Sequence, residues 1–254
     1  MLKHKYSVFI FFIFLLFLFF IKASMISYFL SCVAFLGITS WGAFDMKLNY
    51  FSKNICQANH CKEKVIALTF DDGPHEKTID VLDLLLKYNA KATFFCIGKQ
   101  IEKYPEIVKR IIAEGHNIGN HSYSHSNWNG FFSAEKIASE IEQTNTLITQ
   151  LVNVKTRFYR PPFGVTNPNI AKAISKTNQM AIGWNIRSLD TVIKNENFIL
   201  ERIKKRVQPG SIILLHDTSA KTVSVLEQLL LFLQSESYKT VTIDELLEIS
   251  KDEN

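Results

Sequence analysis

The pattern of apolar and polar positions divides the chain into an apolar N-terminal part and a longer part in which short apolar runs alternate with amphipathic segments. From residue 63 onward, the apolar runs predict strands, and segments with an apolar residue every three or four positions predict helices. Strands are expected at 64–70, 91–97, 116–120, 156–160, 179–185, 211–215 and 239–243. Helices are expected at 76–88, 101–114, 133–151, 167–177, 196–207, 221–234 and 243–250. About seven strand–helix units in succession predict an α/β fold, either a parallel barrel or an open parallel sheet.

The N-terminal part has the composition of a membrane anchor. Residues 6–21 are almost wholly apolar and follow Lys3 and Lys5, and a second apolar stretch covers residues 25–44. Together the two stretches are long enough for two short spans of roughly 20 residues each. Because no small-residue cleavage site follows residue 21, we expect a retained anchor rather than a cleaved signal peptide.

The side of the membrane on which the domain lies depends on how many stretches cross. If only residues 6–21 cross, the basic flank stays inside and the domain is extracytoplasmic. If both stretches cross as a hairpin, the domain returns to the cytoplasm. We prefer one anchor, with residues 25–44 extending it or lying against the membrane or the domain. A start at Met25, which would lack a basic flank, is a third alternative. The resulting division is 1–44 for the anchor region, 45–62 for a linker and 63–250 for the α/β domain.

Composition excludes several classes of protein. A chain of 254 residues with ordinary charge and few Gly or Pro is neither disordered nor repetitive. The net charge of +5 raises the alternative of a nucleic-acid binder, as do four basic residues on one predicted helix: Arg202, Lys204, Lys205 and Arg206. No nucleic-acid motif accompanies them, so we interpret them as a solvated outer helix face and expect no nucleic-acid partner.

The four cysteines do not predict a metal site of their own, because their spacings do not make two zinc knuckles. Cys32 and Cys96 lie in apolar runs, where a cysteine behaves as a small apolar side chain. Cys56 and Cys61 lie close together in the polar linker, and whether they form a disulfide depends on export.

The first candidate chemistry follows the strand predicted at 64–70, where Asp71 and Asp72 precede Gly73 and Pro74. Neighbouring carboxylates on a turn point in different directions, so one can ligate a cation while the other accepts a proton. The alternative is a polar strand-to-helix turn in which an aspartate caps the next helix. Complementary groups at the ends of later strands favour the first interpretation.

Two histidines provide such groups after the strand predicted at 116–120. His121 and His125 share one face if their segment forms a helical turn. Asp72 adds a third ligand, and two imidazoles with one carboxylate leave positions open for water and substrate, as in a catalytic zinc site. Without Asp72, the pair would more often be surface polar residues.

Arg160 ends another predicted strand and precedes two consecutive prolines. An arginine at this place can hydrogen-bond a carboxylate such as Asp71 and hold it ionised and oriented. The backbone N–H of Phe163, beyond the prolines, is free to face a developing oxyanion. Taken alone, the segment would be a structural turn with a solvated arginine.

His216 ends the apolar strand predicted at 211–215, where a general acid would sit in a barrel. Its reference pKa of ~6.5 suits proton donation near neutrality. Asp190 is a candidate for orienting His216 and favouring its charged form. The alternative is a strand-end histidine satisfied by a neighbouring turn.

Five motifs in this order resemble those of the polysaccharide deacetylases, the NodB-homology group or carbohydrate esterase family 4. They are Thr69-Phe-Asp-Asp-Gly-Pro74, His121-Ser-Tyr-Ser-His125, Arg160-Pro-Pro-Phe-Gly164, Asp190 and Leu214-Leu-His216. The resemblance covers roughly residues 63–250 and implies a distorted (β/α) barrel with seven strands, preceded here by the N-terminal membrane segment.

The resemblance also implies roles for individual residues. One divalent metal ion, usually Zn²⁺ with Co²⁺, Ni²⁺ or Mn²⁺ as alternatives, would be bound by Asp72, His121 and His125. Asp71 would be the general base held by Arg160, and His216 would be the general acid tuned by Asp190. The implied oxyanion and substrate-binding residues are Phe163, Pro161, Leu214 and Trp184. The fourth motif departs from the family pattern at Arg187 and Thr191, where an acidic residue and a tryptophan are usual, so one wall of the substrate groove is changed.

The predicted function is a metal-dependent hydrolase of carbon–nitrogen bonds other than peptide bonds, which removes N-acetyl groups from an N-acetylglucosamine-containing polysaccharide and releases acetate. Peptidoglycan, poly-N-acetylglucosamine and chitin-like oligomers are the candidate substrates at the cell envelope. An O-deacetylase of acetylated polysaccharide would use the same groups. A non-catalytic, membrane-anchored carbohydrate-binding protein is a further alternative, but it would have no use for Asp71, Asp190 and His216 together.

Overall fold

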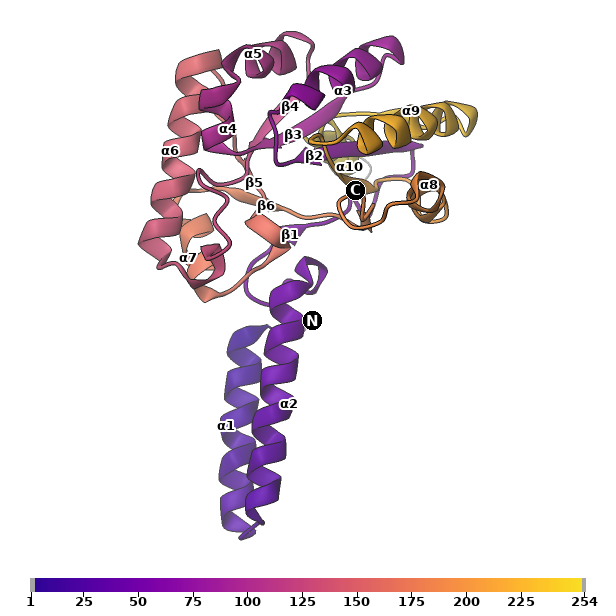
Figure 1. The fold of residues 1–254 in the computed structure, drawn as a ribbon. Helices are drawn as coiled ribbons and strands as arrows, with labels where there is room; N and C mark the ends of the chain where they lie inside the picture. Colours follow the sequence, from indigo (N-terminus) through magenta and orange to yellow (C-terminus); the bar gives the residue numbers. More distant parts are fainter. Residues whose placement is uncertain (1–2, 253–254) are drawn as a thin grey trace.

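The computed structural model describes residues 3–252 as a helical hairpin attached to an α/β domain (Figure 1). The helical hairpin consists of α1 (His4–Phe20) and α2 (Met25–Phe44). The strands of the domain are β1 (Asn54–Ile55), β2 (Val65–Asp71), β3 (Ala92–Cys96), β4 (Asn117–Asn120), β5 (Phe158–Tyr159), β6 (Met180–Ile182), β7 (Ile186–Arg187), β8 (Ile212–His216) and β9 (Lys239–Thr240). Its α-helices are α3 (Glu76–Lys87), α4 (Gly98–Lys103), α5 (Pro105–Ala113), α6 (Ala134–Val152), α7 (Pro168–Lys176), α8 (Glu196–Lys204), α9 (Ala220–Ser235) and α10 (Ile243–Asp252). Three short 3₁₀ helices are η1 (Met46–Leu48), η2 (Asn129–Phe131) and η3 (Pro162–Gly164).

The strands form one parallel sheet in the order β1-β6-β5-β4-β3-β2-β8-β7, and β9 pairs with the start of β2. The sheet curls into a half-barrel with helices around its outside (Figure 1). No pairing joins β1 to β7 among residues 3–252, so the half-barrel has two edges. The expected parallel α/β fold is confirmed, but the expected number of seven strands is too low. The extra strands, β1 and β7, contain two residues each and give no apolar run for a sequence pattern to detect.

The helix predicted at 101–114 is divided into two. Helix α4 begins earlier, at Gly98, and the chain bends at Tyr104 before α5 begins at Pro105. A proline has no N–H to donate to the preceding turn, but it suits the first position of a new helix.

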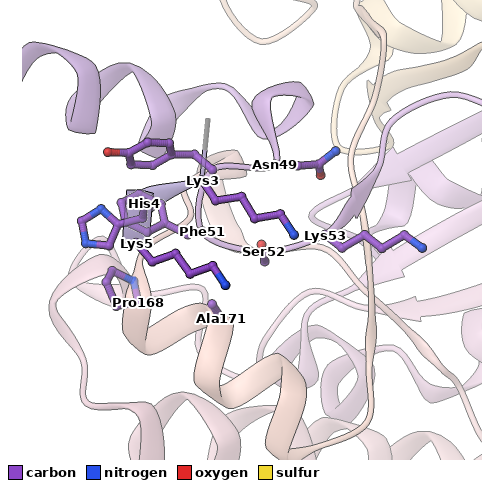
Figure 2. A pocket seen from close by; sticks show the side chains of 10 residues that line it. Lys3, His4, Lys5, Asn49, Phe51, Ser52, Lys53, Pro168 and Ala171 are labelled. Carbon is purple, nitrogen blue, oxygen red and sulfur yellow. The ribbon is translucent and has the colours of Figure 1, made fainter. Parts of the chain in front are cut away.

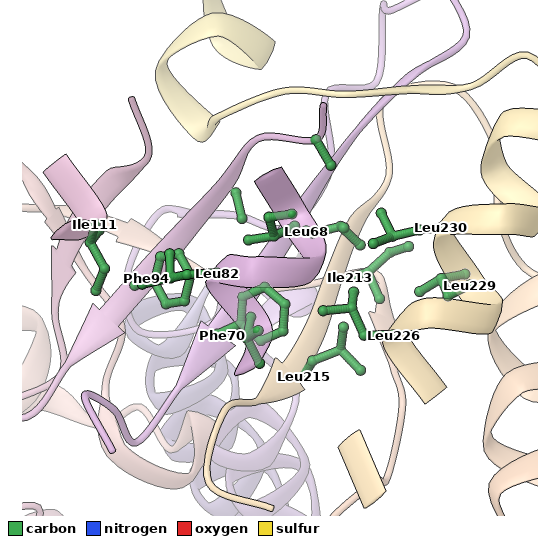
Figure 3. Packing of buried hydrophobic residues seen from close by; sticks show 14 of the residues in the cluster. Leu68, Phe70, Leu82, Phe94, Ile111, Ile213, Leu215, Leu226, Leu229 and Leu230 are labelled. Carbon is green, nitrogen blue, oxygen red and sulfur yellow. The ribbon is translucent and has the colours of Figure 1, made fainter. Parts of the chain in front are cut away.

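The strand in the middle of the sheet has two buried faces with different chemistry. Residues Ile66, Leu68 and Phe70 of β2 pack against helices, and Figure 3 shows Leu68 and Phe70 within the apolar cluster between the sheet and α9. Successive strand side chains point to opposite faces, so Thr69 and Asp71 face the interior of the half-barrel. One face of β2 therefore places the polar side chains of Thr69 and Asp71 inside the half-barrel, while the other face packs in the hydrophobic core.

The two helices of the helical hairpin are antiparallel and pack through Phe11 and Phe35, whose stacked rings lie 4.4 Å apart. By length and composition α2 is able to cross a membrane, and α1 is a shorter apolar helix. Because the chain reverses between the helices, residues 25–44 do not extend the first stretch. Both ends of the hairpin contact the domain, since Thr166 N–H donates to Ala43 O at 2.9 Å and His4 N–H donates to Tyr50 O at 2.9 Å.

The segment predicted as a linker, residues 45–62, contains η1 and β1 and is part of the packed structure. Strand β1 lengthens the sheet by pairing with β6. Cys56 and Cys61 are buried and are not joined by a disulfide. Cys96 is also buried, as its apolar surroundings in the sequence predict, whereas Cys32 is exposed on α2.

Candidate functional site

The adjacent aspartates at the end of β2 occupy different environments. Asp71 is the last residue of the strand and is 4% exposed, whereas Asp72 has a φ of 74°, which turns its side chain in another direction. The next residue leaves no room for a side chain, because a Cβ at Gly73 would lie 2.2 Å from Oδ2 of Asp217 and would force that carboxylate to move. The local backbone thus separates two neighbouring carboxylates, as the sequence predicts.

The histidine segment after β4 is a bend, so the helical turn on which the shared face of the two histidines was conditional is not present. Ser122 and His125 both have positive φ values, 64° and 46°. Side chains hold the bend, because Asn120 Oδ1 accepts from Ser122 N–H at 2.8 Å and Ser122 Oγ accepts from His125 N–H at 3.0 Å. The imidazoles of His121 and His125 nevertheless lie together, with ring centroids 4.9 Å apart.

Asp72, His121 and His125 form a compact group of three ligands. Oδ1 of Asp72 lies 3.5 Å from Nε2 of His121 and 3.3 Å from Nε2 of His125. Nδ1 of His121 lies 2.8 Å from the main-chain oxygen of Arg160, which can only accept a hydrogen bond, so this nitrogen carries the proton. Nε2, the other ring nitrogen, faces Asp72. Such a second hydrogen bond is the usual way in which a metal-binding histidine is oriented, so the residues present fit a divalent transition-metal ion.

The charges of this group also suit a cation. Burial opposes ionisation of Asp72, but the hydrogen bond from His121 and the nearby imidazoles outweigh it and hold the pKa of Asp72 below its usual range. Burial lowers the pKa of His125, and the neighbouring His121 lowers it further. Asp72 and His125 are therefore favoured in the forms that bind a metal. Burial would lower the pKa of His121, but the charges of Asp71 and Asp72 outweigh it and raise that pKa, so an ion that binds His121 displaces a proton.

Arg160 is completely buried and fixes Asp71. Its Nη1 donates to Asp71 Oδ1 at 2.7 Å and to Thr69 Oγ1 at 2.9 Å. Its other donors bond the main-chain oxygens of Ile182 at 3.1 Å and Gly183 at 2.9 Å. The predicted contact between Arg160 and Asp71 is therefore present, within a network that includes Thr69. Sequence reasoning gave Thr69 no role, although its position two residues before Asp71 on the same strand face was the available signal.

His216 and Asp190 form a second oriented pair. Nδ1 of His216 lies 2.8 Å from Asp190 Oδ1, and the His216 N–H donates to Asp190 Oδ2 at 2.8 Å. Ser188 and Thr222 also donate to this carboxylate, each at 2.9 Å, and sequence reasoning missed both. Burial alone would lower the pKa of His216, but the hydrogen bond and charge of Asp190 outweigh it and raise the pKa. Strand register places His216 directly opposite Asp71, so this pair lies beside the Arg160 network.

The predicted oxyanion and substrate-binding residues lie around the same end of the sheet. Phe163 has a φ of 61° and places its half-exposed ring 4.7 Å from that of His125. Pro161 is buried at the start of η3. Trp184 packs so closely on Gly164 that a Cβ there would lie 2.4 Å from the indole. Leu214 is buried two positions before His216 and therefore shares its strand face.

Asp217 is a further buried acid that sequence reasoning left out. Its Oδ2 accepts a hydrogen bond from Thr78 Oγ1 at 2.6 Å. Burial, together with the negative charge of Asp72, raises the pKa of Asp217 to about 7. Its place directly after His216 was the signal that could have identified it. Asp217 supports the turn at Gly73 from behind, because it lies against that residue.

Comparison with known proteins agrees with this arrangement. The family model described as "Polysaccharide deacetylase" matches residues 58–182. A peptidoglycan-N-acetylglucosamine deacetylase of Bacillus cereus is 35% identical over 192 residues, which cover 74% of this chain and 70% of that protein. The peptidoglycan-N-acetylmuramic acid deacetylase PdaC of Bacillus subtilis is 32% identical over 190 residues, covering 74% of this chain and 40% of that protein.

A solved structure described as peptidoglycan deacetylase PdaC from Bacillus subtilis superposes with a TM-score of 0.71 at 32% identity and covers 75% of this chain and 93% of that structure. The residues matched by the family model include the first three of the five motifs. The chain therefore belongs to the polysaccharide deacetylase family and is a hydrolase of that family.

Proposed function

We propose that this protein removes the acetyl group from N-acetylglucosamine residues of peptidoglycan, which yields a free amine on the glycan and acetate. The observation that carries the proposal is the arrangement of three oriented groups at one end of the sheet. They are Asp71 fixed by Arg160, the ligand group of Asp72 with His121 and His125, and His216 fixed by Asp190. The names of the relatives from Bacillus cereus and Bacillus subtilis support peptidoglycan as the substrate.

The ligand group and the base have separate tasks in this proposal. Asp72, His121 and His125 would hold the divalent ion, with Zn²⁺ as our proposed metal. When bound, such an ion supplies Lewis acidity toward the acyl oxygen and toward water. Asp71 accepts a proton from the attacking water, because its Oδ1 is engaged by Arg160 while Oδ2 lies on the side of His121, 3.8 Å from Nε2. The buried guanidinium keeps this carboxylate in one orientation during the transfer.

In this proposal, His216 protonates the leaving group and the backbone N–H of Phe163 stabilises the oxyanion. Nδ1 of His216 bonds Asp190, which leaves Nε2 to give its proton to the departing sugar nitrogen. The backbone N–H of Phe163 donates to the oxygen that becomes negative as the acyl carbon turns tetrahedral. Leu214 contributes apolar surface for the acetyl methyl, and Trp184 with Pro161 borders the sugar. Arg187 and Thr191 are exposed and occupy positions where the family usually has an acidic residue and a tryptophan. We propose that this changed wall of the groove affects whether N-acetylglucosamine or N-acetylmuramic acid is preferred.

Acetate release by the purified full-length protein tests the function directly. Peptidoglycan, N-acetylglucosamine oligomers and acetylated xylan are the substrates, each assayed before chelation, after chelation and after zinc is restored. We expect release from peptidoglycan that is lost on chelation and recovered with zinc. Release from the ester substrate alone would instead identify an O-deacetylase. Bound metal without release from any substrate would indicate a carbohydrate-binding protein.

We further propose that the helical hairpin inserts into the membrane and that the domain lies on the extracytoplasmic side, where mature peptidoglycan is found. The exposed apolar side chains of α1 and α2 support insertion. Lys3 and Lys5 would then lie outside, against the usual bias of basic residues toward the cytoplasm. This bias favours a second arrangement, with the domain in the cytoplasm and a membrane-linked, N-acetylated precursor as substrate. Digestion of the domain by external protease in wall-stripped cells supports the first arrangement, and protection until lysis supports the second.

Replacing Asp190 with Asn is expected to move the alkaline limb of the pH–activity profile to lower pH. His216 acts in its protonated form, so activity falls as the pH rises through its folded pKa, and the Asp190 carboxylate raises that pKa. Loss of an adjacent negative charge lowers such a pKa by roughly 1–3 units. The measurement is kcat/KM for acetate release between acidic and alkaline pH. An alkaline limb at the wild-type position would contradict the tuning of His216 by Asp190.

A further inference from the structure

A large cavity lies where the helical hairpin meets the domain, away from the ligand group. It has a volume of about 570 Å³ and lies between the start of α1, residues 49–53 and α7. Figure 2 shows Lys3 and Lys5 extending from the start of α1 toward the segment that carries Ser52 and Lys53, with Pro168 and Ala171 of α7 on the other side. Three chain segments that are distant in the sequence thus bring their side chains to one cavity.

The charge of this cavity is positive. Lys3, Lys5 and Lys53 line it and are exposed, and no acidic residue is among the residues that line it. Within residues 3–252, none of these three lysines forms a salt bridge. Three positive charges thus line one cavity that has no acidic residue in its lining, so all three would attract a bound anion.

One wall of the cavity is aromatic. The imidazole of His4 lies edge-on to Tyr50, with centroids 5.4 Å apart, and 4.8 Å from the ring of Phe51. Lysines above an aromatic and apolar wall suit a ligand with a charged group and an apolar part. A freely soluble anion would use only the lysines.

The position of the cavity relative to the hairpin agrees with such a ligand. Helix α2 has 20 residues and is therefore about 30 Å long, which matches the hydrocarbon thickness of a bilayer. Its last turn carries the exposed Trp41 and Phe44, and the exposed large hydrophobic residues of α1 begin at Tyr6, directly after Lys5. Tryptophan and lysine are typical of the membrane–water boundary. The cavity thus lies at the level where lipid phosphates are found if the hairpin is inserted.

We infer that this cavity binds the phosphate-bearing headgroup of an anionic membrane phospholipid. Lys3, Lys5 and Lys53 bind the phosphate, and the aromatic wall of His4 and Phe51 contacts the glycerol and the start of the acyl chains. The inference rests on the proposed membrane insertion of the hairpin but not on the deacetylase activity. It holds for either orientation of the domain, because the cavity is formed on the same side of the hairpin as the domain.

Native mass spectrometry of the full-length protein in detergent tests the inference, with phosphatidylglycerol and phosphatidylcholine as probes. The informative variant combines Lys3→Gln, Lys5→Gln and Lys53→Gln. The matched control combines Lys194→Gln, Lys205→Gln and Lys251→Gln, which remove the same charge from exposed positions outside the cavity. We expect phosphatidylglycerol to bind the first variant on the order of 100-fold more weakly than wild type, since each basic residue contributes roughly fivefold at an anionic surface. The control should bind it as wild type does.

Additional measurements separate the ways in which the inference can fail. Equal retention of phosphatidylglycerol by the wild type and the cavity variant would overturn it, as would an equal loss in the control variant. Displacement of the lipid by inorganic phosphate at the concentration at which a short-chain phosphatidylglycerol displaces it would identify a soluble-phosphate site and also overturn it. Partition of the wild type into the aqueous phase of a detergent solution would overturn both insertion and headgroup binding. Acetate release from soluble oligomers should be the same in both variants as in the wild type. Because lipid binding is measured separately, absence of deacetylase activity would not change the conclusion about lipid binding.

Discussion

Replacing Asp71 with Asn is expected to lower acetate release by roughly a thousandfold, because a positioned general base contributes about 10²–10⁴-fold. Asparagine keeps the shape of the side chain and an oxygen that accepts from Arg160, but it takes up no proton at neutral pH. The zinc content should remain close to wild type, since Asp71 is not one of the three clustered ligands. The measurements are single-turnover acetate release and metal analysis of the same sample. Turnover above a tenth of the wild-type value would contradict the role of Asp71 as base.

Thr69→Val is the matched control for Asp71→Asn. The Asp71 exchange leaves a buried guanidinium without its negative partner, which destabilises a protein by about 3–5 kcal/mol. Thermal unfolding is therefore recorded for each variant, and activity is measured well below the midpoint. Thr69→Val removes another contact of Arg160 but leaves the contact with Asp71 in place. We expect a stability loss of about 1–2 kcal/mol and turnover within about tenfold of wild type. Equal losses of turnover in both variants would show that the Arg160 network, and not the carboxylate, limits the reaction.

The fold was predictable where a strand carries its own signal. Strands such as β2 and β8 are buried apolar runs, and their lengths and order follow from the sequence. Strands β1 and β7 contain two residues each, and their pairing depends on neighbours contributed by distant parts of the chain. No local pattern could reveal them. The same reason explains why residues 45–62 were expected as a linker.

The candidate site was predictable to the extent that its groups are strand-end residues. Asp71, Arg160 and His216 lie at the carboxyl ends of strands or one residue beyond, where a parallel sheet gathers functional groups. The geometry of the histidine segment was not predictable, because a spacing of four is equally compatible with a helical turn and with the bend that is present. Asn120 and Ser122 determine the bend through side-chain hydrogen bonds to the backbone. Such hydrogen bonds cannot be predicted from the residue types alone.

The groups that support the site were the least predictable. Thr222 reaches Asp190 from the start of α9, and Thr78 reaches Asp217 from α3, so each contact joins residues from different strand–helix units. Serine and threonine occur throughout the chain, so their presence carries no signal until the fold places them. Of the residues that orient the predicted catalytic groups, Arg160 and Asp190 were therefore predictable from the sequence, whereas Thr222 and Thr78 were not.

Replacing His121 with Ala is expected to weaken zinc binding at least 100-fold and to abolish acetate release. Removal of a mere hydrogen-bond partner of a ligand typically costs 10–100-fold in metal affinity, and the loss of a ligand costs at least as much. Within residues 3–252, the ligand group consists of Asp72, His121 and His125, and the buried ring of His121 is oriented by the main-chain oxygen of Arg160.

The matched control for His121→Ala is His60→Ala, which removes an exposed imidazole that is not part of the ligand group. Zinc is titrated into the metal-free form of each variant in competition with a chromophoric chelator, and thermal unfolding is followed with and without zinc. Zinc should stabilise the wild type and His60→Ala, because an ion that binds only the folded state raises its stability, but it should not stabilise His121→Ala. Full zinc content and stabilisation in His121→Ala would contradict the ligand group, and the metal-dependent mechanism would then have to be placed elsewhere in the molecule.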